Sequence, residues 1–384
     1  MTIGIDARFF GPKAKGLGRY TQKLIAGLEQ ADKQNDYLIF LRRENFDEYQ
    51  QQNPRFKKIL ADWRWYSLAE QIFFPWQLYR YKIDLMHFTH FNAPLFYRRP
   101  LVLTVHDLIL QHWPTRKNNF LSQIKYFFKS LGYKIVIRSA LARARQIITV
   151  SQWVKEDIIR SFGVAERKIS VIYEGAPARL ASESVAGGPE APNSEILEKY
   201  KIKKPYLLYV GNAYPHKNLE RLAEAFKLLR NGQYPNLQLV LVGGEDYFYQ
   251  KLKKENCDSQ GVCFGGGVVF TGFVPDEELR QLYANASLYV FPSLCEGFGL
   301  PPLEAMSQGA PVAASNSTCL PEILGDAALY FDGENPQDMA DKISEVLNDE
   351  SLRQKLITQG FGQIKKYSWQ KMAEEVFVVY RLIY

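Results

Sequence analysis

The sequence lacks the features of a membrane-spanning or secreted protein. None of its apolar runs reaches the roughly 18 residues that a bilayer-spanning helix needs. Its first residues, Met1-Thr2-Ile3-Gly4-Ile5-Asp6, contain neither a basic segment nor the small-residue cleavage site of a signal peptide. We therefore expect a cytoplasmic protein.

Residues that bind metals or form disulfides are also scarce. The four cysteines form no Cys-x-x-Cys pair and are too few for a disulfide framework in 384 residues, so we expect reduced thiols. No Asp-x-Asp pair occurs, and His87 and His90 have no convincing third ligand. These absences argue against a metal-diphosphate site, and we expect no metal.

Acidic residues are missing from one long stretch of the first half. None occurs between Asp107 and Glu156, where nine Lys and Arg residues stand. Residues 1–175 contain 28 Lys and Arg against 15 Asp and Glu, whereas residues 176–384 contain 20 against 26. The first half therefore suits an anionic partner, which could be nucleic acid, anionic lipid or a phosphorylated acceptor.

The sequence does contain a repeated alternation of short β-rich runs and helical patterns. Its 384 residues suit two α/β domains better than one. The alternation predicts a parallel, doubly wound sheet in each half. The strands expected in the first half are Thr2–Asp6, Tyr37–Leu41, Ile83–Phe88, Leu101–His106, Ile147–Val150 and Ile169–Tyr173. Those expected in the second half are Tyr206–Val210, Leu237–Val242, Val268–Phe273, Leu288–Phe291, Val312–Ala314 and Ala328–Phe331.

A change of composition divides the two halves. Small and turn-forming residues dominate from Ala176 to Ser194, which is typical of a linker. We expect a Rossmann-like acceptor-side domain at 1–175, a linker at 176–203, a nucleotide-sugar-binding Rossmann-like domain at 204–367, and a C-terminal helix at 368–384. Parallel sheets bind ligands beyond the carboxyl ends of their strands, so we expect a cleft between the domains.

Two glycine-containing turns could bind phosphate groups. Lys15-Gly16-Leu17-Gly18-Arg19-Tyr20 stands between the first strand and a helix, where backbone N–H groups can approach an anion. Gly211-Asn212-Ala213-Tyr214-Pro215-His216-Lys217-Asn218 follows a strand in the second half, with Lys217 at a helix entry and Asn218 as the expected N-cap. The alternatives are an ordinary turn and a solvated lysine.

A third motif carries two carboxylates eight residues apart. Glu296-Gly297-Phe298-Gly299-Leu300 forms a glycine-containing loop, and Glu304 falls in the first turns of the helix that follows. One carboxylate could hold the hydroxyls of a hexose and the other those of a ribose. The alternative is a solvated loop residue and a carboxylate that only complements the helix dipole.

His106 is the remaining candidate, because it ends the apolar run Leu101–Val105 at the edge where parallel sheets bind ligands. Asp107 could orient the His106 ring or cap the next segment. The alternative is a structural histidine that closes a strand.

Together these motifs resemble the retaining GT-B glycosyltransferases known as group 1 or family 4, over nearly the whole chain. The strongest likeness runs from Phe270 to Phe331. In the first half, Gly-x-Gly-Arg-Tyr, Tyr66-Ser67-Leu68-Ala69-Glu70-Gln71 and Thr104-Val105-His106-Asp107-Leu108 resemble a subgroup that acts on bacterial surface polysaccharides and includes many mannosyltransferases. The resemblance implies two Rossmann-like domains that face each other across a cleft, and a C-terminal helix that returns to the first domain.

The resemblance also implies the role of each site residue. Lys217 would bind the donor diphosphate, Glu296 the transferred sugar, and Glu304 the ribose. His106 would contact the donor sugar near the reacting carbon. Asn212 is a departure, because many members have an arginine near this position. The catalytic set is His106, Lys217 and Glu296, and the donor-binding set is Gly16, Gly211, Asn212, Lys217, Phe273, Val274, Glu296, Gly297, Phe298, Gly299, Leu300 and Glu304.

The implied reaction is transfer of a hexose from a nucleotide diphosphate sugar, with GDP-mannose as the first choice. The acceptor would be a saccharide or a lipid-linked saccharide, and no cofactor, metal or nucleic acid would take part. Alternatives are a sugar-nucleotide-binding scaffold at the membrane, and another GT-B enzyme such as an epimerase or a phosphorylase.

Contact with the membrane is a separate question. The segment 125–133 mixes lysines with aromatic residues in a predicted helix. It could lie peripherally on the inner face of an anionic membrane, or it could bury its aromatics in a core and solvate its cations.

Overall fold

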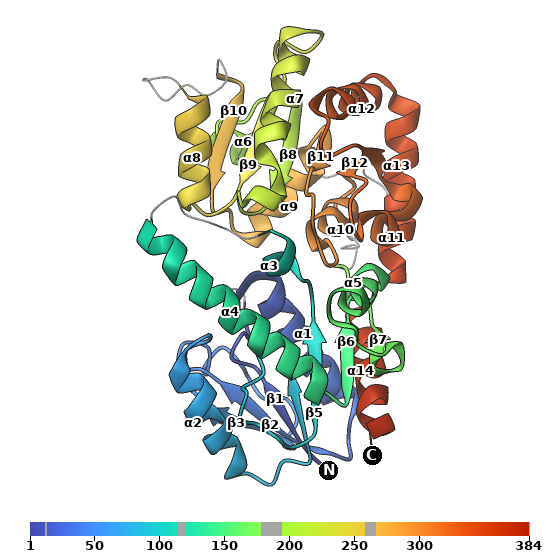
Figure 1. Ribbon diagram of the computed structural model, residues 1–384. Helices are drawn as coiled ribbons and strands as arrows, with labels where there is room; N and C mark the ends of the chain where they lie inside the picture. Colours follow the sequence, from blue (N-terminus) through green and yellow to red (C-terminus); the bar gives the residue numbers. More distant parts are fainter. Residues whose placement is uncertain (12–13, 114–119, 178–193, 258–265, 384) are drawn as a thin grey trace. The chain divides into compact units, whose positions relative to one another are not determined.

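The computed structural model describes residues 1–11, 14–113, 120–177, 194–257 and 266–383 (Figure 1). The chain forms two compact units. Unit 1 comprises Met1–Gly175 with Tyr367–Tyr384, and unit 2 comprises Ala176–Lys366. Each unit contains one parallel sheet, so the doubly wound α/β architecture predicted from the sequence is confirmed.

The sheet of unit 1 has seven strands in the order β3-β2-β1-β4-β5-β6-β7, and every neighbouring pair is parallel. The strands are β1 Thr2–Asp6, β2 Asp36–Leu41, β3 Phe56–Leu60, β4 Leu85–Phe88, β5 Leu101–Val105, β6 Gln146–Thr149 and β7 Ile169–Val171. The helices are α1 Lys15–Ala31, α2 Leu68–Tyr79, α3 Ile109–His112, α4 Phe120–Arg143, α5 Gln152–Phe162, the 3-10 turn Glu166–Lys168 and α14 Trp369–Ile383.

Strand β3 was absent from the sequence prediction. It pairs only with β2 in the strand order and forms the edge of the sheet. Its sequence, Phe-Lys-Lys-Ile-Leu, places two lysines in adjacent positions, and lysines are usual on edge strands, where they blunt pairing with other chains. The continuous apolar run that marks an interior strand of a parallel sheet is therefore missing, and the prediction of six strands was wrong.

Two hydrophobic clusters cover the two faces of this sheet. Val102 and Ile148 point into the cluster that contains α1 and α14, whereas their neighbours Leu103 and Ile147 point into the cluster with α2, α4 and α5. Successive residues of a strand point to opposite faces, so both faces of β5 and β6 must be apolar. This explains the continuous apolar runs in the sequence.

The C-terminal helix α14 packs closely on α1 within unit 1. A Cβ atom built on Gly27 of α1 would lie 2.4 Å from the Cβ of Ala373, so the two helices can approach only because this residue is glycine. Met372, Val376 and Tyr380 of α14 are buried in the same cluster. The last helix is therefore part of the core of unit 1.

The sheet of unit 2 has six parallel strands in the order β10-β9-β8-β11-β12-β13. The strands are β8 Tyr206–Val210, β9 Gln238–Val242, β10 Val268–Gly272, β11 Leu288–Phe291, β12 Val312–Ser315 and β13 Leu329–Phe331. The helices are α6 Ser194–Lys199, α7 Leu219–Asn231, α8 Tyr247–Asn256, α9 Asp276–Asn285, α10 Leu300–Ser307, α11 Leu320–Leu324, α12 Pro336–Asn348 and α13 Glu350–Gln363, with 3-10 turns at Pro215–Lys217, Gly325–Ala327 and Ile364–Lys366.

Two further sequence expectations can be compared with the structure. Cys257 is disulfide-bonded, so the expectation of reduced cysteines was wrong for this residue, whereas Cys295 and Cys319 are buried free thiols. In the described part of the chain, no helix combines the length and the apolar character that crossing a bilayer requires.

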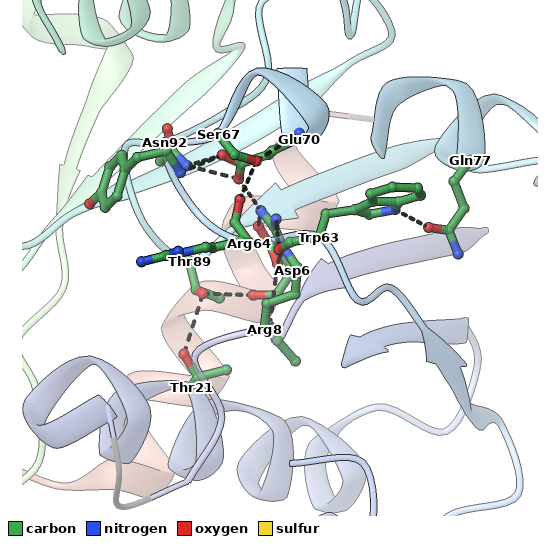
Figure 2. A network of polar contacts seen from close by, with 12 residues as sticks. Asp6, Arg8, Thr21, Trp63, Arg64, Ser67, Glu70, Gln77, Thr89 and Asn92 are labelled. Atoms are coloured by element: carbon green, nitrogen blue, oxygen red, sulfur yellow. Dashed lines mark hydrogen bonds and ion pairs between the residues drawn. The ribbon is translucent and has the colours of Figure 1, made fainter. Parts of the chain in front are cut away.

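A buried ion network supports the carboxyl end of β1 (Figure 2). The guanidinium of Arg8 donates to both carboxylate oxygens of Asp6, at 2.8 and 2.7 Å, and lies 2.7 Å from Oε1 of Glu70. Burial lowers the pKa of Arg8, but the two adjacent carboxylates outweigh this effect and raise it. The amide of Asn92 donates to both oxygens of Glu70, at 2.8 and 2.9 Å.

Glu70 reaches this network because it occupies the first turn of α2. Ser67 is the N-cap, and its hydroxyl accepts a hydrogen bond from the backbone N–H of Glu70 at 3.1 Å. A serine followed three residues later by glutamate is a helix-start signal. Here the Glu70 side chain accepts from the N–H of Tyr66 at 2.8 Å. The start of α2 thus fixes the carboxylate that pairs with Arg8.

Arg8→Lys should lower the free energy of unfolding by about 1–3 kcal/mol, because a lysine cannot reproduce the two-pronged contact with Asp6 and a buried acceptor loses its donor. Urea unfolding measures the loss. Arg55→Lys is the matched control, since Arg55 forms an exposed pair with Asp36 at 3.1 Å, and such pairs contribute about 0–1 kcal/mol.

The same variant should respond to pH. Burial raises the pKa of Glu70, so the folded state binds this proton more tightly than the unfolded state does. Stability linked to Glu70 therefore increases as the pH falls through its folded-state pKa. The free energy of unfolding that Arg8→Lys loses relative to the wild type should be smaller at mildly acidic pH than at neutral pH. A loss that increased on acidification would contradict the role given to Glu70.

Candidate active site

Lys217 and Glu296 meet where the strand order of unit 2 reverses. Strands β8 and β11 are adjacent and parallel, although two other strands separate them in the sequence. The loops that follow them therefore leave the sheet at the same carboxyl edge. In open α/β sheets this is the place where ligands bind.

The two side chains form a short ion pair. Nζ of Lys217 lies 2.5 Å from Oε1 of Glu296, and the side chains are only 15% and 10% exposed. The backbone N–H of Glu296 donates to Oγ1 of Thr318 at 3.1 Å, which fixes the loop that carries the carboxylate. The structure thus holds a cation and an anion side by side at the strand ends.

Asn218 joins the two loops, but it does not act as the predicted side-chain cap. It stands at the N-cap position of α7 without a capping hydrogen bond from its side chain. Its amide nitrogen donates instead to the carbonyls of Pro292, at 3.1 Å, and Gly333, at 2.6 Å. Asn218 has a positive φ of 62°, a conformation that asparagine adopts more readily than most other residues.

His216 does not add a second cation beside Lys217. Burial and the adjacent Lys217 lower the pKa of His216 to about 4, so its ring is neutral at pH 7. Its backbone carbonyl accepts a hydrogen bond from the N–H of Leu294 at 2.8 Å. His216 therefore serves to attach the Lys217 loop to the Glu296 loop.

Gly211 and Asn212 begin the loop after β8, as the sequence predicts. The carbonyl of Gly211 accepts from the hydroxyl of Tyr249 at 3.0 Å, and that of Asn212 accepts from Tyr209 at 2.7 Å. A Cβ atom on Gly243 would lie 2.0 Å from the Gly211 carbonyl oxygen, so the neighbouring loop also approaches closely. These contacts fix the course of the loop.

The loop from Glu296 to Gly299 leads directly into α10. Gly299 has a φ of 97° and forms the N-cap, so Leu300 is the first helical residue. The thiol of Cys319 donates to the carbonyls of Glu296 and Phe298, both at 3.4 Å. These two hydrogen bonds hold the loop through its backbone carbonyls.

Glu304 lies on α10, and the predicted base contacts lie after β10. The hydroxyl of Tyr283 donates to Oε2 of Glu304 at 3.3 Å. Val274 is buried, whereas the Phe273 ring is 78% exposed. The ribose role of Glu304 and the base roles of Phe273 and Val274 stay predictions.

In unit 1, His106 is held by hydrogen bonds at both ring nitrogens. Nδ1 lies 2.9 Å from Oε1 of Glu174, and Nε2 lies 3.0 Å from the carbonyl oxygen of Thr89. The ring of Tyr20 meets the imidazole edge-on, with centroids 4.6 Å apart. A carbonyl can only accept and a carboxylate normally does, so this geometry fixes the ring and engages both nitrogens.

Glu174 is the residue that the sequence interpretation missed. Asp107, predicted to orient His106 or to cap the next segment, does the second: its Oδ1 accepts from the N–H of Ile109 at 3.0 Å. Glu174 lies 68 residues after His106, just beyond β7, and no local spacing relates the two. The only available signal was its position after a predicted strand and next to Gly175.

The two glycines of the first turn motif differ in burial. Gly16 is exposed in the first turn of α1, where N–H groups are available to an anion. Gly18 is buried, and a Cβ atom there would lie 1.9 Å from the carbonyl oxygen of Gly11. Gly18 is therefore required by backbone packing, while the phosphate role of Gly16 stays a prediction.

The rings of His87 and His90 are neutral, and His87 is fully buried whereas His90 is half-buried. Burial lowers the pKa of each to about 3. His87 is hydrogen-bonded to Thr104 at 2.8 Å and to Tyr380 at 2.5 Å, so it links the sheet to α14. Across the described residues, no three His, Cys, Asp or Glu side chains are grouped so as to hold a metal ion.

Two family models match the chain. The model described as Glycosyl transferases group 1 matches residues 193–363, which include Lys217, Glu296 and Glu304. The model described as Glycosyltransferase Family 4 matches residues 14–179, which include His106 and Glu174.

Curated relatives match in both units. The O-antigen chain mannosyltransferase B of Escherichia coli is 31% identical over 96% of this chain and 96% of its own length. The O-antigen chain mannosyltransferase RfbU of Salmonella typhimurium is 28% identical over 75% of this chain and 70% of its own length.

Solved structures share the fold. Sucrose-phosphate synthase from Thermosynechococcus elongatus aligns with a TM-score of 0.74 at 20% identity, covering 100% of this chain and 99% of its own. Anabaena Alr3699/HepE in complex with UDP-glucose aligns with a TM-score of 0.72 at 18% identity, covering 99% of both chains. At such identities the likeness concerns the fold alone.

Proposed function

We propose a donor and an acceptor for this chain, which belongs to the glycosyl transferases of group 1 and is a glycosyltransferase of GT-B fold. The proposed donor is GDP-mannose, and the proposed acceptor is a saccharide or lipid-linked saccharide in surface-polysaccharide synthesis. The names of the Escherichia coli and Salmonella relatives, both O-antigen chain mannosyltransferases, support this choice.

The observation that carries the proposal is the Lys217–Glu296 pair at the strand ends of unit 2. A nucleotide diphosphate sugar joins an anionic diphosphate directly to a ring bearing hydroxyl groups. Lys217 is assigned to the diphosphate, and Glu296 to hydroxyls of the sugar, which donate to a carboxylate. The two side chains lie 2.5 Å apart, so both can reach a ligand in which the diphosphate is bonded directly to the sugar.

The proposed mechanism places the main burden on electrostatic stabilisation. As the bond between the sugar and the diphosphate breaks, negative charge grows on the departing phosphate, and Lys217 and backbone N–H groups stabilise it. The acceptor attacks an oxocarbenium-like sugar from the face that the diphosphate leaves, so the configuration is retained. A phosphate oxygen takes the acceptor proton, and neither a metal nor a cofactor has a role.

Screening nucleotide sugars by thermal shift tests the donor. A ligand that binds the folded state at about 100 times its Kd stabilises it by about 2.7 kcal/mol, which gives a measurable rise in Tm. GDP-mannose and GDP should raise Tm more than UDP-glucose and UDP. The reverse order would replace the proposed donor with a uridine nucleotide sugar, such as the one named for the Anabaena structure.

Two rival functions have different outcomes in a transfer assay. Purified protein incubated with labelled GDP-mannose and a saccharide acceptor should release GDP and form a new glycoside. A sugar-nucleotide-binding scaffold would bind the donor without releasing GDP. An epimerase would alter the labelled sugar without joining it to an acceptor.

Substituting the two carboxylates should separate their roles. Glu304→Gln should weaken nucleoside diphosphate binding by about tenfold, because a charge-assisted hydrogen bond to ribose contributes about 1.5–3 kcal/mol. Glu296→Gln should leave that binding nearly unchanged and reduce sugar transfer. Calorimetry with GDP measures the first effect and the transfer assay the second. If Glu296→Gln weakened GDP binding more than Glu304→Gln did, the two assignments would be reversed.

A further inference from the structure

Helix α2 of unit 1 has an apolar outer face. Figure 1 shows this helix at the margin of the unit. Five of its large apolar residues are between 37% and 84% exposed. They are Leu68, Ile72, Phe73, Trp76 and Tyr79. Contiguous exposed apolar surface of this kind marks an interaction site in a water-soluble domain.

The opposite face of the same helix is already buried. Glu70, Phe74 and Leu78 recur at intervals of four residues, and all three are buried in unit 1. In a helix that only covers a sheet, the outer face would be polar. The outer face of α2 is instead apolar at Leu68, Ile72 and Trp76, which share the same interval of four. The helix therefore has apolar surface on two sides, of which unit 1 covers one.

Adjoining residues extend this surface beyond the helix. The hydroxyl of Tyr79 donates to the carbonyl of Phe96 at 3.0 Å, and the Phe96 ring is exposed. The amide of Gln77 donates to the carbonyl of Leu60 at 2.7 Å, and the Leu60 side chain is exposed as well. We call these seven residues, Leu60, Leu68, Ile72, Phe73, Trp76, Tyr79 and Phe96, the α2 patch.

The polar residues around the α2 patch are mainly cationic. Residues 60–100, which span the patch, contain five arginines and lysines, Arg64, Arg80, Lys82, Arg98 and Arg99, against three acids. Of the acids, Asp62 pairs with Arg42, Glu70 is buried in the ion network, and Asp84 accepts from the backbone N–H of Thr2 at 2.7 Å. The guanidinium of Arg80 lies 3.6 Å above the Trp76 ring, and that of Arg99 lies 5.1 Å from the Tyr79 ring.

We propose that the α2 patch binds the surface of an anionic lipid bilayer. Tryptophan and tyrosine favour the interface of a bilayer, and arginines stacked on them can extend to lipid phosphates while the rings enter the acyl boundary. A second copy of the chain is a poorer occupant, because it would bring two sets of these cations together. The net charge of residues 1–175, with 28 basic residues against 15 acidic ones, favours the same partner.

This surface differs from the one expected from the sequence. Within segment 125–133, the side chains of 125–129 lie outside the described residues, so membrane contact through that segment stays a prediction. The α2 patch could not be found by the same reasoning, since Phe73-Phe74-Pro75-Trp76 looks like core in the sequence. The proposal goes beyond the proposed donor and acceptor, because it concerns a surface that includes none of the site residues.

Vesicle co-sedimentation of the full chain tests the proposal. The probe is vesicles of phosphatidylcholine with about one part in four of phosphatidylglycerol, compared with pure phosphatidylcholine at low and high salt. The variant is Ile72→Glu with Trp76→Glu, which places two carboxylates on the outer face. The control is Leu228→Glu, since Leu228 is exposed on α7 of unit 2 and lies outside the α2 patch.

We expect the wild type and the control to bind the anionic vesicles, and the double variant to bind at least about tenfold more weakly. Transfer to a water-soluble acceptor should be unchanged in the double variant, which separates this surface from the active site. Absence of wild-type binding would overturn the proposal, as would equal binding by the double variant. Self-association of the wild type that the double variant abolishes, without vesicle binding, would assign the α2 patch to a second copy.

Discussion

Lys217→Ala is expected to lower kcat/KM for the donor by about 30-fold to several thousand-fold, equivalent to a loss of about 2–5 kcal/mol of transition-state stabilisation. The contact with the diphosphate should strengthen as the donor bond breaks, because negative charge on the departing phosphate increases. Within the motif of residues 211–218, Lys217 is the one charged side chain, because His216 is neutral.

The ion pair with Glu296 complicates a single substitution. Removing Lys217 leaves a carboxylate that is 10% exposed without its cation, and this can lower the stability or displace the loop. Lys217→Ala with Glu296→Gln removes both charges. If Lys217 acted only by neutralising Glu296, the double variant would be no slower than Glu296→Gln alone. If it binds the diphosphate, the double variant should be much slower.

Lys199→Ala is the matched control for this experiment. Lys199 also forms an ion pair in unit 2, at 2.7 Å from Glu278, but its side chain is 55% exposed. Removing it should leave turnover unchanged. Turnover of Lys217→Ala at subsaturating donor that equals the wild-type rate would eliminate Lys217 as the diphosphate ligand.

The sequence predicted the parts of the molecule that depend on local pattern. The strand before Gly211 and the strand before Glu296 are short apolar runs, so their carboxyl ends could be recognised. That these two ends are neighbours follows from the order β8-β11, which no local pattern encodes. The Lys217–Glu296 pair is therefore consistent with the sequence interpretation, although its 2.5 Å contact could not be derived from it.

Two side chains show what sequence spacing could not predict. Asn218 stands at the expected N-cap position, but its amide donates to carbonyls 74 and 115 residues away instead of its side chain capping the helix. Asp107 caps the segment that follows it, which was one of its two expected roles, and Glu174 takes the other by binding the ring of His106. In each case a tertiary partner competes successfully with a local one, and sequence spacing contains no information about it.

His106→Ala is expected to slow sugar transfer by about 100-fold while leaving nucleoside diphosphate binding near normal, because misplacement of reacting groups by about 1 Å can cost that factor. Transfer kinetics and calorimetry with GDP measure the two quantities. The expectation of a positioning role follows from the ring geometry, in which Nδ1 faces Glu174 and Nε2 faces the Thr89 carbonyl. A general base needs a ring nitrogen that can take the acceptor proton.

The pH profile distinguishes the two roles. A general base would give kcat/KM an acid limb in the range where histidines titrate, and substitution would remove it. A positioning residue lowers the rate at every pH and leaves the shape of the profile intact. We expect the second outcome, and loss of the acid limb in His106→Ala would identify His106 as the base.

Glu174 supplies the test of whether the ring orientation matters. Glu174→Gln keeps an oxygen that can accept from Nδ1, so kcat should fall only slightly, whereas Glu174→Ala should lower kcat by about tenfold or more with little change in the KM for the donor. Rescue by the glutamine is the readout that a purely structural role would not produce, provided that both variants unfold at similar temperatures. Equal losses in the two variants would mean that the charge of Glu174, rather than the orientation of His106, is what transfer requires.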